Sequence, residues 1–394
     1  MKTRIKIGIV VSHPIQHFCP QYRSLAENPD LEVKVFFASK LGVESYNDAQ
    51  FNLSIKWERL YLENFPHIFL NQQPISTNKN LDAQGLELEL DKFKPDFILT
   101  YGYYQKVQKR AYNWAKLNNI PILYVSDSEL LRYRFFGKSL IKKVWLNKYF
   151  KGISGFLSVG DANEEYYSYY GVPLNKMFRT FFPVDIFSMD EIIDKQELSN
   201  IQIKETYNIH NGDKVILTVG KLLDYKNHLD VINSLSILDT NESITIHYLI
   251  VGDGPEKENL KKHASRLKHH KVHFVGFIQP HELYKYYCVA DIYVHPSTVD
   301  AHSLSISEAI YAGCPILVSS NCGSYGPTDD VQHGYNGYVY EVMNSNSLAS
   351  KILYILKNNL VKSLFSHNSR KLGLAHQKLA HGEGLLKAIR ASVT

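Results

Sequence analysis

The segment that decides the fold runs from Asp291 to Ser319 and reads DIYVHPSTVDAHSLSISEAIYAGCPILVS. It begins with an apolar run typical of a buried strand, Ile292 to His295, and a loop of small residues follows from Pro296 to Ser303. A helix that carries Glu308 comes next. Amides at a helix start lack partners within the helix, and the helix dipole places about half a positive charge there. This arrangement favours an anion, so the segment predicts a site for a nucleoside diphosphate. The amides expected to face it are those of Ser303, Leu304 and Ser305.

Two carboxylates flank the predicted anion site. Glu308 lies about one turn inside the helix, and at ~1.5 Å rise per residue its carboxylate falls several ångström past the phosphate. The ribose hydroxyls of a bound nucleotide would lie there. Asp300 lies on the loop before the helix. It is expected to face whatever lies beyond the diphosphate, which in a nucleotide sugar is the sugar.

The spacing of Asp300 and Glu308, followed by the run from Ala309 to Ser319, resembles the signature of retaining glycosyltransferases of family 4. That family usually has Glu at the position of Asp300. At the three positions that follow, it usually has Gly or Pro, an aromatic residue and then Gly, where this chain has Ala, His and Ser. The resemblance implies the two-domain architecture called GT-B and a nucleotide-sugar donor. The departures leave the identity of the donor sugar open.

The composition suits two cytoplasmic domains. A chain of 394 residues, 44% of them apolar, is too long for one ordinary core. The net charge of +5 is mild, and no arginine-rich run or zinc-spaced cysteines indicate nucleic acid. The four scattered cysteines fit a reducing compartment. We expect neither a leader sequence nor a membrane span, because the chain opens directly into a strand and has no apolar run of about 18 residues.

Short apolar runs alternate with longer amphipathic stretches along the chain, which predicts parallel sheets covered on both faces by helices. The pattern breaks between Pro183 and Asn211, where polar residues dominate. We expect two doubly wound α/β domains, residues 1–185 and 186–375, facing a cleft at the carboxyl ends of their strands. The resemblance implies that a final helix, about residues 376–394, crosses back onto the first domain. The predicted strands are Ile5–Val11, Val33–Phe37, Phe97–Thr100, Ile122–Val125, Phe156–Val159, Val215–Val219, His247–Val251, Val272–Val275, Ile292–His295 and Ile316–Ser319.

The second domain is expected to bind the donor. The loop after Val219 carries Lys221 and Lys226, which can converge on one diphosphate. By resemblance, these two cations hold the donor phosphates and stabilise the departing nucleotide. Lys221 replaces the commoner Arg, so the charge is kept while the bidentate fork is lost. The resemblance also places the backbone near Phe277 at the edge of the nucleobase. The expected donor-binding residues are Gly220, Lys221, Lys226, Gly252, Phe277, Ile278, Asp300, His302, Ser303, Leu304 and Glu308, and Lys221, Lys226 and Asp300 are also expected to act in catalysis.

Asp329 and Asp330 form a pair of adjacent carboxylates in a turn. Because consecutive residues of a turn point apart, and no Asp-x-Asp follows a strand elsewhere, we expect no metal site and no cofactor. We interpret the turn as structural. The two lysines and the helix start would then meet the charge of the diphosphate.

The first domain is expected to bind the acceptor. Its first strand ends just before His13, and Pro14 fixes the turn, so His13 is presented toward the cleft. Many family 4 enzymes place a histidine near the reacting sugar on a later loop, but the corresponding segments here contain none. Asp127, Tyr101 or His13 could take that role, and the sequence leaves the choice open. The expected acceptor-binding residues are His13, His17, Tyr101 and Asp127, and His13 and Asp127 are also candidate catalytic residues.

Residues 132–151 hold seven basic residues, six aromatic residues and no acidic one. A helix of this kind suits an anionic membrane surface, and lipid-linked acceptors are common in the family that the chain resembles. The simpler interpretation is a solvated helix whose aromatic side chains pack on the first domain. Peripheral contact with a membrane therefore stays open.

Together with these features, the resemblance to family 4 implies a retaining, metal-independent hexosyl- or deoxyhexosyltransferase. It would move a sugar from a UDP- or GDP-linked donor to a hydroxyl group of a glycan or a lipid-linked acceptor. One alternative is a non-hydrolysing sugar-nucleotide epimerase, which shares the two-domain fold but needs no acceptor. Another is a non-catalytic partner that binds nucleotide sugar. The spacings of the lysines and of the carboxylates favour a transferase.

Overall fold

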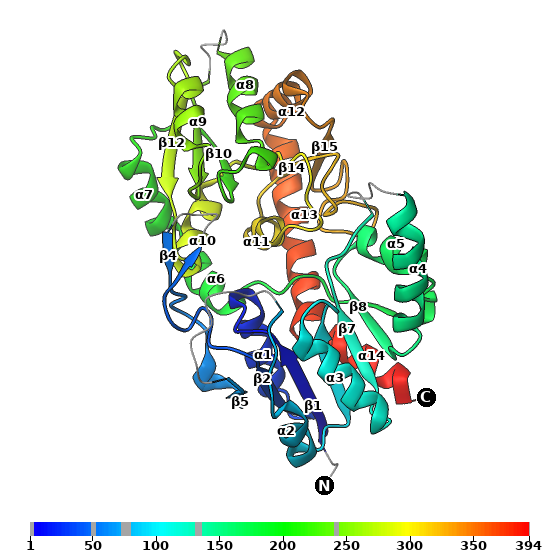
Figure 1. Ribbon diagram of the computed structural model, residues 1–394. Helices are drawn as coiled ribbons and strands as arrows, with labels where there is room; N and C mark the ends of the chain where they lie inside the picture. The colour runs from blue at the N-terminus through cyan, green and yellow to red at the C-terminus, as the bar shows by residue number, and fades with distance from the viewer. Residues whose placement is uncertain (1–3, 49–52, 72–79, 131–135, 240–243, 394) are drawn as a thin grey trace.

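The protein consists of two α/β units that face each other across a cavity (Figure 1). The computed structural model describes residues 4–48, 53–71, 80–130, 136–239 and 244–393. Both large sheets are parallel, as the continuous apolar runs predict. Each sheet has a buried hydrophobic cluster on either face. The GT-B fold predicted from the sequence is confirmed.

The first sheet has seven strands in the order β5-β2-β1-β6-β7-β8-β9. The inner strand β1 is almost entirely buried because Ile and Val fill its pleats on both faces. The strands are β1 Ile5–Val11, β2 Leu31–Phe37, β5 His67–Phe69, β6 Phe97–Tyr101, β7 Ile122–Val125, β8 Gly155–Ser158 and β9 Met177–Arg179. The helices of this unit are α1 Cys19–Ala26, α2 Leu86–Phe93, α3 Lys106–Leu117, α4 Phe136–Phe150 and α5 Asp161–Tyr169.

The second sheet has six strands in the order β12-β11-β10-β13-β14-β15. The strand order reverses direction along the chain at β10 and β13, and ligands bind at the carboxyl ends of strands at such a switch point. The strands are β10 Lys214–Val219, β11 Ile246–Val251, β12 Lys271–Gly276, β13 Ile292–His295, β14 Ile316–Ser319 and β15 Gly337–Tyr340. The helices are α6 Ile186–Ile193, α7 Gln196–Thr206, α8 His228–Leu238, α9 Lys257–Ala264, α10 Pro280–Val289, α11 Leu304–Ala312, α12 Ser345–Lys357 and α13 Asn359–Lys378.

The end of the chain returns to the first unit. Helix α13 runs from the second sheet toward the first, where a π turn and helix α14 (Gly384–Val393) follow (Figure 1). The side chains of Leu385, Ala388 and Ile389 belong to the same buried cluster as strand β1. The expected return of the final helix is thus confirmed. The boundary at residue 185 stays a prediction, because α6 contacts both units.

Each predicted strand overlaps a strand of the structure. The short strands β5, β9 and β15 were not predicted, and neither was the hairpin of β3 (Tyr46–Asp48) and β4 (Leu53–Ile55). Over the described part of the chain, no helix combines the length and apolar character needed to cross a bilayer.

Candidate functional site

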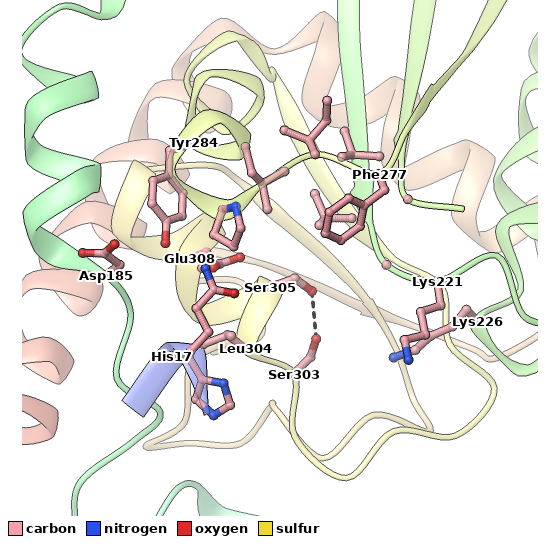
Figure 2. A pocket seen from close by; sticks show the side chains of 18 of the residues that line it. His17, Asp185, Lys221, Lys226, Phe277, Tyr284, Ser303, Leu304, Ser305 and Glu308 are labelled. Atoms are coloured by element: carbon pink, nitrogen blue, oxygen red, sulfur yellow. Dashed lines mark hydrogen bonds between the residues drawn. The ribbon is translucent and has the colours of Figure 1, made fainter. Parts of the chain in front are cut away.

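A cavity of about 530 Å³ lies between the two units, a volume in the range typical of small-molecule sites. All eleven residues expected to bind the donor line it, together with His13 and His17 of the first unit. Figure 2 shows the lysines of the β10 loop on one side of the cavity and Glu308 and Asp185 on the other. The residues are Gly220, Lys221, Lys226, Gly252, Phe277, Ile278, Asp300, His302, Ser303, Leu304 and Glu308.

Lys221 and Lys226 point their ammonium groups toward the same region (Figure 2). Lys226 Nζ lies 2.5 Å from Asp300 Oδ2, an ion pair that the sequence did not predict. The sequence analysis assigned Lys226 to the diphosphate of a donor and Asp300 to its sugar. In this structure the two side chains form an ion pair with each other.

Asp300 forms a hydrogen bond with His295, the last residue of β13. His295 Nε2 lies 2.9 Å from Asp300 Oδ2. Burial alone would raise the pKa of Asp300, but the hydrogen bond and charge of His295 and of Lys226 hold it well below its usual value. Asp300 is therefore ionised throughout the physiological pH range. Sequence reasoning missed His295, although its place at the carboxyl end of a predicted strand was a usable signal.

Helix α11 begins at the floor of the cavity with Ser303 as its N-cap residue. Ser303 N donates to Ser324 Oγ over 2.8 Å, so the expectation that this amide is open to a ligand is wrong. The amides of Leu304 and Ser305 follow in the first turn and have no acceptor within the helix. The hydroxyls of Ser303 and Ser305 lie 2.9 Å apart (Figure 2). Two amides, rather than three, are available to an anion.

Glu308 is buried one turn further along α11, where Tyr287 donates to its Oε2 over 2.8 Å. Burial raises the pKa of Glu308 to about 7, and the charge of nearby Asp185 adds to the rise. The carboxyl group can therefore change its charge near neutral pH. A ligand with two adjacent hydroxyls would offer hydrogen bonds that favour the ionised form.

The backbone at the ends of β10 and β11 approaches closely beside the cavity. Gly252 has φ +142°, and a Cβ on it would lie 1.9 Å from the carbonyl oxygen of Gly220. Only glycine fits there. Gly220 and Gly252 line the cavity together with Phe277 and present backbone there, which suits a flat ring.

From the first unit, His13 and His17 line the cavity. Burial lowers the pKa of each to about 4, so both imidazoles are neutral at neutral pH. Ser12 Oγ lies 2.9 Å from His13 Nδ1 and fixes the ring. A neutral imidazole at this position can donate or accept a hydrogen bond, which suits contact with sugar hydroxyls.

Two further residues expected near the acceptor do not line this cavity. Tyr101 packs its ring 4.6 Å from that of Phe18 and donates to Gln21 Oε1 over 3.2 Å. Asp127 is exposed beyond β7. Residues to which the sequence assigned no role also line the cavity, namely Ile15, Gln16, Trp57, Asp185 and Tyr284.

Asp329 and Asp330 are both fully buried. The expectation that the two side chains point apart is wrong, since both face His302: its Nε2 lies 3.2 Å from Asp330 Oδ2 and its Nδ1 3.9 Å from Asp329 Oδ1. Burial alone would lower the pKa of His302, but the hydrogen bond to Asp330 and the charges of both carboxylates raise it to about 9. His302 is therefore an imidazolium at neutral pH.

The carboxylate oxygens of this cluster all accept hydrogen bonds from the protein. Asp330 Oδ1 accepts from His376 of α13, and Ser307 donates to Asp330 Oδ2. Asp329 accepts from the amides of Asp330 and Asp161. His302, Asp329 and Asp330 lie close enough together to hold a metal ion. The carboxylate oxygens of the two aspartates, however, already accept hydrogen bonds from N–H and O–H donors of the protein.

Comparisons with known proteins identify relatives of the chain. Residues 199–372 match the family described as Glycosyl transferases group 1. The alpha-monoglucosyldiacylglycerol synthase of Streptococcus pneumoniae is 23% identical over 270 residues, which are 63% of this chain and 60% of that protein. The chain thus matches about three fifths of the length of this curated relative.

Two solved structures have the same fold over nearly the whole chain. The glycosyltransferase of Rickettsia africae superposes with a TM-score of 0.74 at 15% identity and covers 99% of both chains. The structure of Anabaena HepE in complex with UDP and glucose superposes with a TM-score of 0.68 at 14% identity, covering 98% of this chain and 100% of that one. At such low identity, these superpositions establish the fold.

Proposed function

We propose that this protein transfers a sugar from a nucleoside-diphosphate sugar to an acceptor hydroxyl, because residues 199–372 match the family described as Glycosyl transferases group 1 and the chain has the GT-B fold. The observation that carries the proposal is the cavity between the units, where two lysines, a helix start and two carboxylates converge. A UDP-linked or a GDP-linked hexose or deoxyhexose is the proposed donor. UDP is the favoured nucleotide, because the Anabaena structure of the same fold holds UDP and glucose.

The proposed donor pose follows from the charges. The diphosphate lies against Lys221, Lys226 and the amides of Leu304 and Ser305, because an anion is favoured by fixed cations and by a helix start. Glu308 accepts from the ribose hydroxyls. The nucleobase lies near Phe277 and Ile278, and Asp300 faces the sugar on the opposite side.

The reaction proceeds with retention of the anomeric configuration and without a metal. The acceptor hydroxyl attacks the anomeric carbon on the face that the nucleotide leaves, and the departing phosphate oxygen takes the acceptor's proton. Negative charge grows on the leaving diphosphate as the bond breaks, so fixed cations stabilise the transition state more than the bound donor. Lys221, Lys226 and the start of α11 supply the main catalytic contribution.

The acceptor is proposed to be a glycan or a lipid-linked glycan that enters beside His13 and His17.

Helix α4 supports the lipid-linked case. Its apolar residues Leu140, Ile141 and Val144 are 66–76% exposed, and Trp145 is 44% exposed. Tyr149 and Phe150 pack inward, as the simpler interpretation expects. We propose that the outer face of α4 lies on an anionic membrane. The basic residues Arg132 and Arg134 of the same segment lie outside the described residues.

The proposal is tested with a panel of nucleotide sugars in a thermal-shift assay, followed by product analysis. A ligand at 100 times its dissociation constant adds ~2.7 kcal/mol to stability, which is readily measured. The Lys226→Ala variant should lower turnover by about a hundredfold or more, and by more than it weakens donor binding. Activity should survive excess chelator. Stabilisation by none of the UDP- and GDP-sugars would contradict the proposal, and donor conversion without any acceptor would favour the epimerase.

A further inference from the structure

The start of α5 in the first unit docks directly onto the turn that precedes β15 in the second unit. Asp161, the first residue of α5, donates its amide to Asp329 Oδ2 over 2.6 Å. In return, Asp161 Oδ2 accepts from the amide of Thr328 over 3.0 Å, and the Thr328 hydroxyl donates to Asp161 Oδ1 over 2.5 Å. Each side of this contact satisfies the other's backbone.

Asp329 acts as the N-terminal cap of a helix that belongs to the other unit. The N-cap position of α5 is Gly160, which has no side chain to offer. A carboxylate near a helix start is favoured both by the unpaired amides and by the helix dipole. A methyl group on Gly160 would lie 2.4 Å from Asp329 Oδ2 and 2.9 Å from His302 Nδ1, so the contact requires glycine at this position.

Arg179 fastens the same contact from strand β9. Its Nη2 lies 2.6 Å from Asp161 Oδ1, and its Nη1 donates to the carbonyl oxygen of Thr328 over 3.2 Å. Its Nε lies 2.9 Å from Glu164 Oε1, which stays within the first unit. We call the contact of Asp161 with Thr328 and Asp329 the joint. Arg179 therefore has one carboxylate partner at the joint, Asp161, and one away from it, Glu164.

The segment that receives α5 also holds the loop that carries Asp300. Gly323 N donates to the carbonyl oxygen of Asp300 over 2.9 Å, and Ser324 Oγ accepts from Ser303 N. His302, in the same loop, lies against Asp329 and Asp330. Residues 322–330 thus contact the donor loop on one side and the first unit on the other.

We propose that Asp161 and Asp329 are positioning residues for the donor site, which hold the loop of residues 300–303 in place only while the first unit is docked. This inference rests on the proposed function. It assigns control of the donor site to residues that never touch the donor. Because coupling between two sites is reciprocal, weakening the joint must weaken nucleotide binding, and bound nucleotide must tighten the joint.

The test compares Asp161→Ala with Glu164→Ala. Both variants remove a carboxylate partner of Arg179 from α5, but only Asp161 reaches the second unit. Binding of UDP and of GDP is measured by calorimetry, and the radius of gyration without ligand is measured by X-ray scattering. We expect Asp161→Ala to bind the nucleotide at least fivefold more weakly and to have a larger radius of gyration. Glu164→Ala should match the wild type in nucleotide affinity and in radius of gyration.

Thr328→Val, on the exposed side of the joint, provides a second variant with less risk to folding. It should also weaken nucleotide binding.

A double-mutant cycle checks that the contact itself is responsible. Gly160→Ala should weaken nucleotide binding, because its methyl group collides with Asp329 and also approaches His302 of the donor loop, and in an Asp329→Ala background the same change should weaken binding by clearly less than it does alone. Additive effects would overturn the proposal, as would Asp161→Ala behaving like Glu164→Ala. If the wild type bound neither UDP nor GDP, the proposed function would fail. An unchanged radius of gyration in Asp161→Ala would then separately overturn the joint.

Discussion

The ion pair of Asp300 and Lys226 affects how each side chain can bind a donor. In this structure, the carboxylate neutralises the lysine over 2.5 Å. A diphosphate that binds Lys226 must therefore compete with Asp300, which remains anchored by His295. Donor binding would free one edge of the carboxylate for the sugar.

The Asp300→Asn variant should separate these two roles. Loss of the negative charge releases Lys226, so affinity for bare nucleoside diphosphate should stay the same or rise. Turnover should fall by about tenfold or more, because the side chain that faces the sugar has lost its charge. Calorimetry and initial rates measure the two effects, with Asp224→Asn, exposed on the lysine loop, as the control. A folded variant that no longer binds the bare nucleotide would contradict this division.

Glu308→Gln should make the empty protein more stable while it weakens nucleotide binding. The pKa of Glu308 is raised from 4.5 to about 7, so the folded state holds this proton more tightly than the unfolded chain. The wild type therefore loses stability as pH rises through that interval, and the glutamine variant does not. Its advantage in urea unfolding should grow by about 2 kcal/mol between about pH 5 and pH 8.

The same variant should bind nucleoside diphosphate several-fold to about tenfold more weakly, because an amide replaces a charged acceptor of the ribose hydroxyls. Unfolding curves that respond to pH in parallel for both proteins would argue against an ionising carboxyl in this position. Unchanged affinity would remove Glu308 from the nucleotide site.

At the residue scale, the sequence indicated the two lysines, Asp300 and Glu308, because they follow the carboxyl ends of predicted parallel strands, which meet at one edge of a sheet. It could not indicate that His302 faces both aspartates, since that contact joins residues 27 and 28 positions apart through the tertiary fold. Asp127 was predicted to contact the acceptor because it follows the end of a strand. In the structure Asp127 is exposed and does not line the cavity.

At the scale of elements, helix α4 carries the clearest unpartnered apolar surface in the described part of the first unit. The variant with both Ile141→Glu and Val144→Glu should bind vesicles of anionic phosphatidylglycerol at least tenfold more weakly, because burying each such side chain contributes about 1.5–3 kcal/mol. Sedimentation with vesicles measures the effect. Leu117→Glu, an 83% exposed position at the end of α3, is the control and should bind as the wild type does. Equal binding by all three proteins would leave α4 a solvated helix.

The long strands could be predicted because β-branched residues fill both faces of a buried parallel sheet, which leaves a continuous apolar run. Strands β5 and β9 have three residues each and are only half buried, so no such run marks them. They form because neighbouring strands offer unpaired edges. An edge of this kind is a property of the sheet and not of the local sequence.

At the scale of the whole molecule, helix α14 completes the core of the first unit from the far end of the chain. The Ile389→Ala variant should lower the stability of that unit by about 2–5 kcal/mol, since the side chain is 1% exposed beneath the first sheet. Hydrogen exchange of β8 and β9 should increase most. Leu374→Ala, 42% exposed on α13, provides the matched control. Loss of protection confined to the second sheet would contradict this placement.

The return of the chain to its starting unit also affects how the protein is made. During synthesis, domains generally fold as units in the order in which they leave the ribosome. Here the emerging first unit lacks Leu385, Ala388 and Ile389 until helix α14 has been translated, whereas the strands of the second sheet are present earlier. The second unit can therefore mature first. Until then, a nascent chain would keep the part of the first sheet around β8 and β9 uncovered, and that part is where a chaperone would bind.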